Sequence, residues 1–169
     1  EKPSDKLKSK SLASSQDIAV GALKHYMLKY NPTSEITFDY KEALKLSGNT
    51  GPYLQYSVAR ASGILSKAGE FDYNYDISFI HVSDSEKELI NLIGRWNEVI
   101  NYTLASNSIS QIAEYAFNLS SAFHTFYEKN NVLKSEEYVR NYRLVIIKAY
   151  YNLISEVLSV MGITAPEQM

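Results

Sequence analysis

Apolar side chains recur at intervals of three or four residues through most of the sequence after residue 51, which is the period of one face of an α-helix. Polar residues that favour helix starts precede these stretches, as in Ser83 followed by Glu86 at the spacing of a capping box. Four long amphipathic helices with short connections are typical of a helical bundle. The predicted helices are 52–67, 84–105, 108–129 and 135–161. In the last of them the predicted core stripe is Tyr142, Ile146, Ala149, Leu153, Val157 and Val160.

The first 51 residues have a different pattern. The stretch 17–29 predicts one helix, and 35–38 is a short alternation of polar and apolar residues. Asp39 then begins a second helix, which is expected to stop at Gly48. We therefore predict that residues 1–51 are a short α/β remnant of a larger domain and its connector, and that 52–169 is an all-α domain.

Two segments interrupt the helical periodicity. The run 48–52 contains two glycines followed by Pro52, a residue suited to the first position of a helix, so a new helix is expected to begin there. Residues 70–83 have no helical period and place Asp and Asn between aromatic residues. This second segment is predicted to be a loop or one extended strand.

Composition narrows the chemistry that the chain can perform. The 169 residues are 45% hydrophobic and include no cysteine, which excludes disulfides, thiolate zinc sites and a cysteine nucleophile. The three histidines, His25, His81 and His124, stand far apart without a carboxylate at helical spacing. We therefore expect no metal site, no catalytic residues and no cofactor within this chain, and we expect the histidines to be solvated or partly packed.

The sequence shows no membrane-spanning stretch of 18 apolar residues, and a cytoplasmic setting is the default for a chain without cysteine. It begins at Glu1 rather than Met, which favours a piece of a longer protein. Net charge is −2, but residues 1–69 carry +4 and residues 70–169 carry −6. If the chain binds nucleic acid, local basic spots and base stacking must supply the attraction, and 14 tyrosines allow such stacking.

The predicted helix 52–67 has two distinct faces. At 100° per residue, Tyr53, Tyr56 and Arg60 cluster on a side of the helix that the core does not use. This face fits three interpretations: an interface with residues 1–51, a stacking platform for unpaired bases, or a hot spot for another protein. The core stripe of the same helix is Leu54, Val58, Ala61 and Leu65.

The run Gly-Asn-Thr-Gly-Pro-Tyr-Leu-Gln-Tyr at 48–56, followed by Arg60, resembles the signature that opens the anticodon-binding domain of arginyl-tRNA synthetases. Further similarities follow in the family's order, among them Phe-Tyr-Glu at 126–128 and Pro-Glu-Gln-Met at 166–169. The resemblance covers about residues 16–169. It implies the tail of the catalytic domain followed by the helical domain that recognises the anticodon of arginine tRNA.

The resemblance also implies roles for individual residues. Tyr53 and Tyr56 would contact anticodon-loop nucleotides, and Arg60 would support them. Tyr127 would help to hold an anticodon base, with Met169 packing nearby. Gln168 departs from the family, which often has arginine there, and so removes a positive charge.

The resemblance further implies what the rest of the enzyme would supply. The family's His-Ile-Gly-His and Lys-Met-Ser-Lys-Ser elements are absent from these 169 residues. The arginine and ATP sites would therefore lie upstream, in a catalytic domain of the same polypeptide. The expected function is arginine-tRNA binding within a ligase, and the alternative is a helical protein-interaction module that uses the face of Tyr53, Tyr56 and Arg60.

Overall fold

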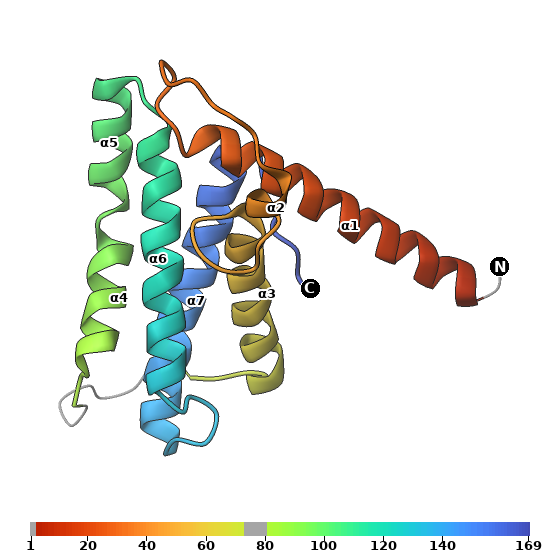
Figure 1. Ribbon diagram of the computed structural model, residues 1–169. Coiled ribbons are helices and arrows are strands. Elements are labelled where there is room, and N and C mark those ends of the chain that lie inside the picture. The colour runs from red at the N-terminus through yellow and green to blue at the C-terminus, as the bar shows by residue number, and fades with distance from the viewer. Residues whose placement is uncertain (1–2, 73–80) are drawn as a thin grey trace.

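A computed structural model describes the backbone of residues 3–72 and 81–169 and the side chains of 15–72 and 81–169. Its described elements are all helices (Figure 1). They are α1 (Pro3–Leu28), α2 (Tyr40–Ala43), α3 (Gly51–Ala68), α4 (Asp84–Gly94), α5 (Trp96–Ser106), α6 (Ser110–Lys129) and α7 (Glu137–Val160). The prediction of an all-α bundle is therefore confirmed.

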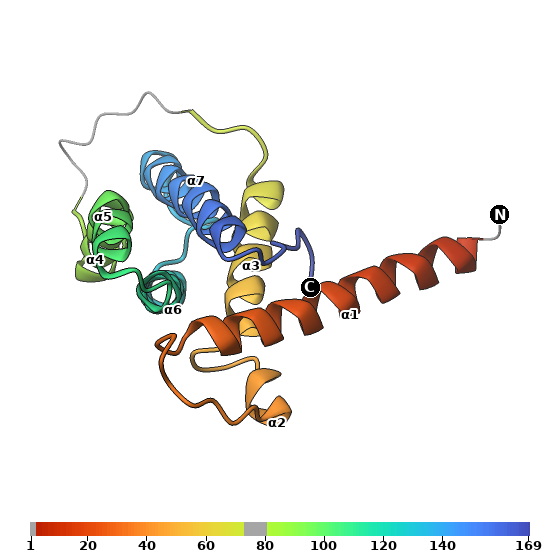
Figure 2. The ribbon, with the colours of Figure 1, turned by 90° about the horizontal axis from the view of Figure 1, so that it is seen from above.

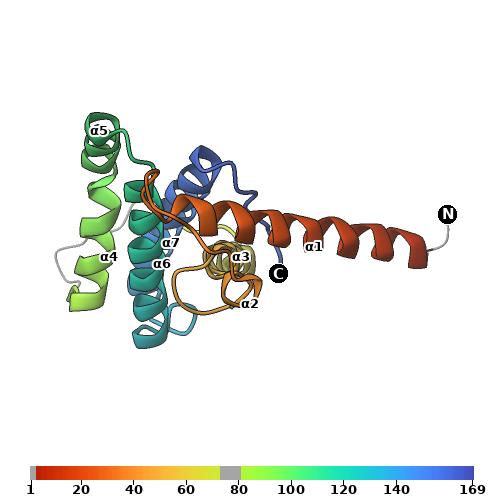
Figure 3. The ribbon, with the colours of Figure 1, turned by 45° about the horizontal axis from the view of Figure 1, so that its top comes forward.

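The bundle consists of α3, the α4–α5 pair, α6 and α7, and successive members run in opposite directions (Figure 1). Seen from above, α6 and α7 lie between α3 on one side and α4–α5 on the other (Figure 2). The helix α1 crosses one end of this bundle, and its N-terminal half extends beyond it (Figures 2 and 3). The connections from α5 to α6 and from α6 to α7 are short, which explains the antiparallel order of these helices, because a few residues can only return the chain beside the helix that it has just left.

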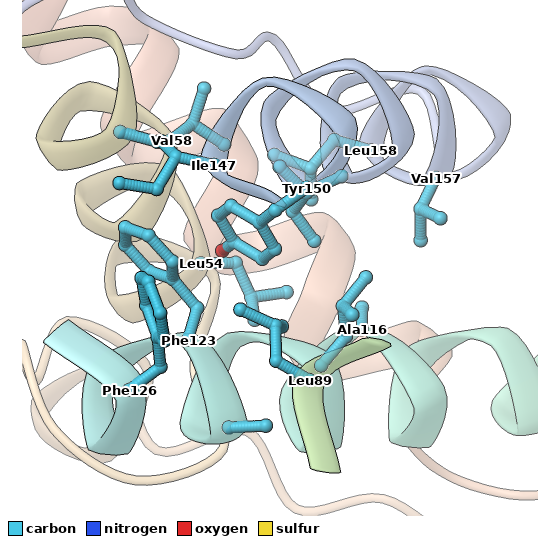
Figure 4. Close-up of a cluster of buried hydrophobic side chains, with 14 of the residues drawn as sticks. Leu54, Val58, Leu89, Ala116, Phe123, Phe126, Ile147, Tyr150, Val157 and Leu158 are labelled. Carbon is cyan, nitrogen blue, oxygen red and sulfur yellow. The ribbon is translucent and has the colours of Figure 1, made fainter. Parts of the chain in front are cut away.

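Aromatic and aliphatic side chains from α3, α4, α6 and α7 fill the core (Figure 4). Tyr150 stacks on Phe123 with ring centroids 4.1 Å apart and an interplanar angle of 4°. Its buried hydroxyl donates to Ser57 Oγ at 2.7 Å, Ser57 in turn donates to Leu54 O at 2.7 Å, and Ser120 Oγ lies 3.1 Å from Ser57 Oγ. Burial raises the pKa of Tyr150 well above its ordinary value. The hydroxyl is thus a neutral, paired group, as a buried tyrosine requires.

The start of α3 is determined by local chemistry. Thr50 caps the helix by accepting a hydrogen bond from Tyr53 N and donates its own hydroxyl to Lys45 O at 2.6 Å. Pro52 occupies the first turn, where it costs no hydrogen bond. Leu54, a member of the predicted core stripe, is buried, as are Val58 and Ala61, whereas Leu65 is only partly buried. The helix predicted over 52–67 is confirmed.

The helix predicted over 84–105 is two helices, broken at Arg95. In an unbroken helix Leu92 O would accept from the residue four positions on, but here it accepts from Arg95 N at 3.1 Å and from the Tyr115 hydroxyl at 2.8 Å. Burial raises the pKa of Tyr115 to about 12, so this hydroxyl remains a donor. Gly94 weakens the helix at the same point. The break follows from contacts with α6, which the periodicity of one helix does not reveal.

The expectation of an α/β remnant in residues 1–51 is wrong in one respect, because 35–38 forms no strand. A strand needs a neighbour to accept its backbone hydrogen bonds, and the described residues offer it none. The helix after Asp39 ends at Ala43 rather than near Gly48. The other predicted strand or loop, 70–83, lies largely outside the described residues.

Two further differences concern helix ends. The first helix begins at Pro3 rather than near residue 17. At the other end of the chain, Val160 is 52% exposed although it continues the predicted core stripe of 135–161. It occupies the last turn of α7, where the helix has passed the end of the core, whereas the buried Tyr150 and Ile154 were not in that stripe.

A buried ion pair joins three helices at the opposite end of the bundle. Arg143 Nε donates to Glu86 Oε1 at 2.8 Å, and the same guanidinium donates to Ser135 Oγ at 2.8 Å and Asn130 Oδ1 at 3.0 Å. Burial alone would raise the pKa of Glu86, but hydrogen bonds from Arg143 and Ser83 hold that pKa below its ordinary value. The network therefore fixes the starts of α4 and α7 against the end of α6.

No helix among the described residues combines the length and the apolar character needed to cross a membrane.

Candidate nucleic-acid interface

The face of α3 that carries Tyr53 and Tyr56 packs against α6. Tyr53 lies between Phe117 and His124, with ring centroids 5.9 and 4.8 Å away, and its hydroxyl is 3.4 Å from Ser121 Oγ. Tyr56 is nearly parallel to His124, at 6.0 Å and 11°. The two tyrosines are half-buried side chains held by α6 rather than rings that stand free in solvent.

Arg60 joins the aromatic residues of the two helices. Its Nη2 donates to the Tyr56 hydroxyl at 2.7 Å, and its Nη1 lies 3.3 Å from His124 Nδ1. Its guanidinium carbon is 4.9 Å from the centre of the Tyr56 ring and 4.7 Å from that of Tyr127. Such distances are typical of cation–π contacts, which hold a planar cation against aromatic faces. We refer to Tyr56, Arg60, His124 and Tyr127 as the arginine cluster.

The protonation state of His124 follows from its partner. A guanidinium can only donate, so His124 Nδ1 must accept, and the neutral ring carries its proton on Nε2. Burial lowers the pKa of His124, and the charge of Arg60 lowers it further, whereas Glu128 opposes the shift. His124 is therefore a neutral acceptor that orients Arg60 near neutral pH.

An open pocket of about 460 Å³ lies beside the arginine cluster. Residues from three parts of the chain line it: Tyr56 and Arg60 from α3, Tyr127 from α6 and Met169 from the C-terminal tail. Met169 and Tyr127 are 45% and 37% exposed, so both can be reached from solvent. The remaining lining residues are Ala59, Gly63, Ile64, Lys67, Glu167 and Gln168. The pocket offers aromatic and apolar surface next to a fixed cation, which suits a planar base next to a phosphate.

Four of the five predicted site residues, Tyr56, Arg60, Tyr127 and Met169, thus surround one opening, although 113 positions separate the first from the last. Tyr53 does not line the pocket and instead packs behind it on His124. The prediction that the core makes no use of this face is wrong for Tyr53, which packs against the core cluster. Among the described side chains, the ring contacts and hydrogen bonds of this face to other elements are with α6 rather than with residues 1–51.

His124 is a member of the cluster that the sequence did not single out, since it was expected only to be solvated or partly packed. A signal was nevertheless present. On α6, Phe117, Ser121, His124 and Tyr127 recur at intervals of four, three and three, which places them along one stripe. That stripe carries the residues that meet the tyrosine face of α3.

The part of the chain that the structure describes contains no group of three or more His, Asp or Glu side chains placed to hold a metal ion. The site presents aromatic rings, one oriented guanidinium and the thioether side chain of Met169.

Residues 54–169 match the family described as the DALR anticodon binding domain. This match includes every member of the arginine cluster and most of the chain. The chain therefore belongs to the DALR anticodon-binding domain family.

Similar proteins indicate which members of this family the chain resembles. The arginine–tRNA ligase of Pyrococcus furiosus is 35% identical over 159 residues, which are 90% of this chain and 25% of the relative, and that of Clostridium botulinum is 34% identical over 96% of this chain and 30% of the relative. Among solved structures, the arginyl-tRNA synthetase of Thermus thermophilus superposes with a TM-score of 0.83 at 32% identity, covering 90% of this chain and 26% of that one. That of Plasmodium falciparum gives 0.78 at 25% identity, covering 93% and 28%.

Within the family, the chain is thus an anticodon-binding domain of the arginyl-tRNA synthetase type, as the resemblance of 48–60 predicted. The chain spans about a quarter to a third of the length of the relatives it matches. Those relatives are ligases, and the chain corresponds to the portion of them that holds the helical domain.

Proposed function

We propose that this chain binds the anticodon loop of an arginine tRNA. The observation that carries the proposal is the pocket in which Tyr56, Arg60, Tyr127 and Met169 meet within a DALR domain. Bases of a tRNA anticodon loop are unpaired and can be unstacked, and aromatic side chains and arginine planes are the groups that proteins use to hold such bases.

Each residue has a definite part in this proposal. Tyr127 and Met169, both exposed at the pocket, contact the inserted base, and Tyr56 bounds the same opening. Arg60, fixed by His124, donates its remaining N–H groups to a base edge or a phosphate. Tyr53 supports the cluster from behind by packing on His124.

We further propose that the activity of the whole enzyme is that of its relatives, which are named arginine–tRNA ligases. Arginine and ATP would then be used in a catalytic domain of the same polypeptide, in the cytoplasm, and this domain would position the tRNA by its loop. Holding a substrate at a remote point in the correct orientation reduces the entropy that the reaction itself must supply.

A fluorescence titration tests the proposal directly. The 169-residue chain is titrated with an arginine-tRNA transcript and, in parallel, with the same transcript carrying a changed middle anticodon base. We expect tighter binding to the unchanged anticodon. Equal affinity for the two transcripts would contradict anticodon recognition.

Salt dependence separates RNA binding from the protein-interaction alternative. Binding to phosphates releases counterions, so the logarithm of the affinity for tRNA should fall linearly with the logarithm of the salt concentration. Arg60→Met should reduce that slope by roughly one if the guanidinium meets a phosphate. A slope near zero would favour a tyrosine-centred protein interface instead.

A further inference from the structure

The C-terminal tail reaches the pocket by crossing α3. After α7 ends at Val160, Gly162 takes a φ of 66° and turns the chain, and Ile163 is buried. The chain then ends beside α3 and α1 (Figures 1 and 2). Residues 167–169 line the pocket, so their position depends on what holds the tail between Ile163 and Glu167.

Gln55 holds the tail at this crossing. Its side chain is fully buried, and its Nε2 donates to Thr164 O in the tail at 2.9 Å and to Asp17 O in α1 at 3.1 Å. Both partners are carbonyl oxygens, which fixes the amide with its NH₂ group toward them. One side chain of α3 therefore ties α1 and the tail together. Gln55 Oε1 has no hydrogen-bond partner among the described residues, which adds to the cost of burying this amide.

The helix α1 contributes two further features to the same crossing. Gly21 faces Gln55, and a Cβ at Gly21 would lie 2.8 Å from the Gln55 amide atoms, so the glycine leaves the space that the amide occupies. Lys24, one turn further along α1, donates from Nζ to the carbonyl of Gly162, where the tail begins. The tail is thus bonded to α1 directly at Gly162 and indirectly at Thr164, where Gln55 of α3 bridges the tail to Asp17 O.

We propose that α1 sets the position of the C-terminal tail in the pocket, with Gln55 and Lys24 as the positioning residues. Neither residue lines the pocket, and both act through the tail that carries Met169. A shift of α1 relative to the bundle would therefore move Met169, and a base seated against Met169 would in turn favour one position of α1. The consequence for tRNA affinity rests on the proposed function, whereas the attachment of the tail does not.

The attachment can be measured without RNA. Because the chain contains no cysteine, Gln168→Cys provides a single site for a fluorophore whose anisotropy reports the motion of the tail. We expect Gln55→Met and Lys24→Met to lower the anisotropy. Tyr150→Phe, which also removes a buried hydrogen bond, and Lys29→Met, which removes an α1 lysine paired with Glu42, should not. Unchanged anisotropy in Lys24→Met would overturn the proposal even if Gln55→Met failed to fold.

The effect on RNA is measured in the unlabelled chain. Gln55→Met should weaken binding of the arginine-tRNA transcript at least about fivefold. A change of this size is typical when one site alters the affinity of another. Combining it with Met169→Ala should cost no more than the larger single effect, because both changes remove the same contact. If the losses of affinity from Gln55→Met and Met169→Ala multiplied in the double variant, Gln55 would not act through the tail. If the wild-type chain does not distinguish anticodons, the proposed function fails, and the anisotropy alone decides the role of α1.

Discussion

Individual side chains in the arginine cluster depend on one another. Arg60 is a flexible residue, but its contacts with Tyr56, His124 and Tyr127 confine it to one arrangement. Holding the guanidinium in place before RNA arrives reduces the entropy lost on binding. The residues that orient Arg60 should therefore matter nearly as much as those that touch the ligand.

Replacing Tyr56 tests the aromatic wall of the pocket. Tyr56→Ala removes both a ring surface and the hydroxyl that accepts from Arg60. We expect it to weaken binding of the arginine-tRNA transcript by about 1–3 kcal/mol, the range found for stacked bases. The titration gives this value directly. Tyr102→Ala on α5, where the tyrosine is 61% exposed and outside the pocket, should leave the affinity unchanged.

The hydrogen bond that His124 accepts can be tested separately from the packing of its ring. His124→Phe keeps an aromatic ring between Tyr53 and Tyr56 but removes the nitrogen that accepts from Arg60. We expect weaker tRNA binding from His124→Phe alone, and no further loss when His124→Phe is added to Arg60→Met, because His124 acts only by orienting the guanidinium. Dissociation constants for the four proteins of this cycle provide the measurement. Independent, additive losses would show that His124 does not act through Arg60.

Among the helices, the crossing of α1 over α3 depends on close approach of the two backbones. A Cβ at Gly51 would lie 2.3 Å from Gly21 O and 2.8 Å from Ala22 N. Only glycine at position 51 permits this approach. The signature run 48–56 therefore includes residues that are required for helix packing, such as Gly51 and Gln55, beside the tyrosines that face α6.

The cost of adding one methyl group checks this explanation. Gly51→Ala should lower the free energy of unfolding by about 1–3 kcal/mol, as overpacking generally does, because backbone must move to admit the Cβ. Gly63→Ala, in the same helix but with no atom within 4 Å of the added Cβ, should instead raise it by roughly 0.5–1 kcal/mol. Urea denaturation of the two variants measures both changes. Similar effects at both positions would contradict the crossing as the cause.

At the scale of the whole molecule, buried histidines couple folding to pH. His25 is fully buried, and its Nε2 lies 2.6 Å from Asn49 Oδ1, which links α1 to the loop before α3. Burial lowers the pKa of His25; the hydrogen bond to Asn49 opposes this shift and the Lys29 charge adds to it. His124 is also shifted downward. In the unfolded chain both rings should titrate near 6.5.

These shifts give a signed prediction. As the pH falls below the pKa of the unfolded histidines, the unfolded state binds more protons than the native state. The stability that the neutral histidines contribute is therefore fully present above about pH 6.5, and it is lost as the pH falls toward the lower pKa values of the folded state. We expect the melting temperature to be constant from pH 8 to 7 and to decline below about 6.5. His25→Gln should lower the melting temperature at pH 7.5 and reduce the slope of that decline. His81→Gln, at an exposed position, should change neither.

A large part of this protein could be predicted from sequence. Periodicity found the main helices because a core-facing stripe must repeat every three or four residues wherever a helix packs on others. The run 48–60 also identified Tyr56 and Arg60 as neighbours one turn apart, which is local helical geometry. The break at Arg95 escaped prediction, since the hydroxyl that donates to Leu92 O at this point belongs to another helix.

What the sequence by itself determined is local: which residues form helices, which face of each is apolar, and which family signature the chain carries. The tertiary structure alone decided which helix meets the tyrosine face, why His124 belongs with Arg60, and how the tail comes to place Met169 beside Tyr127. The physical reason is the distance along the sequence between the residues that make contact. Helical periodicity records contacts between residues three or four apart, whereas the pocket is made by side chains from α3, α6 and the tail that only packing brings together.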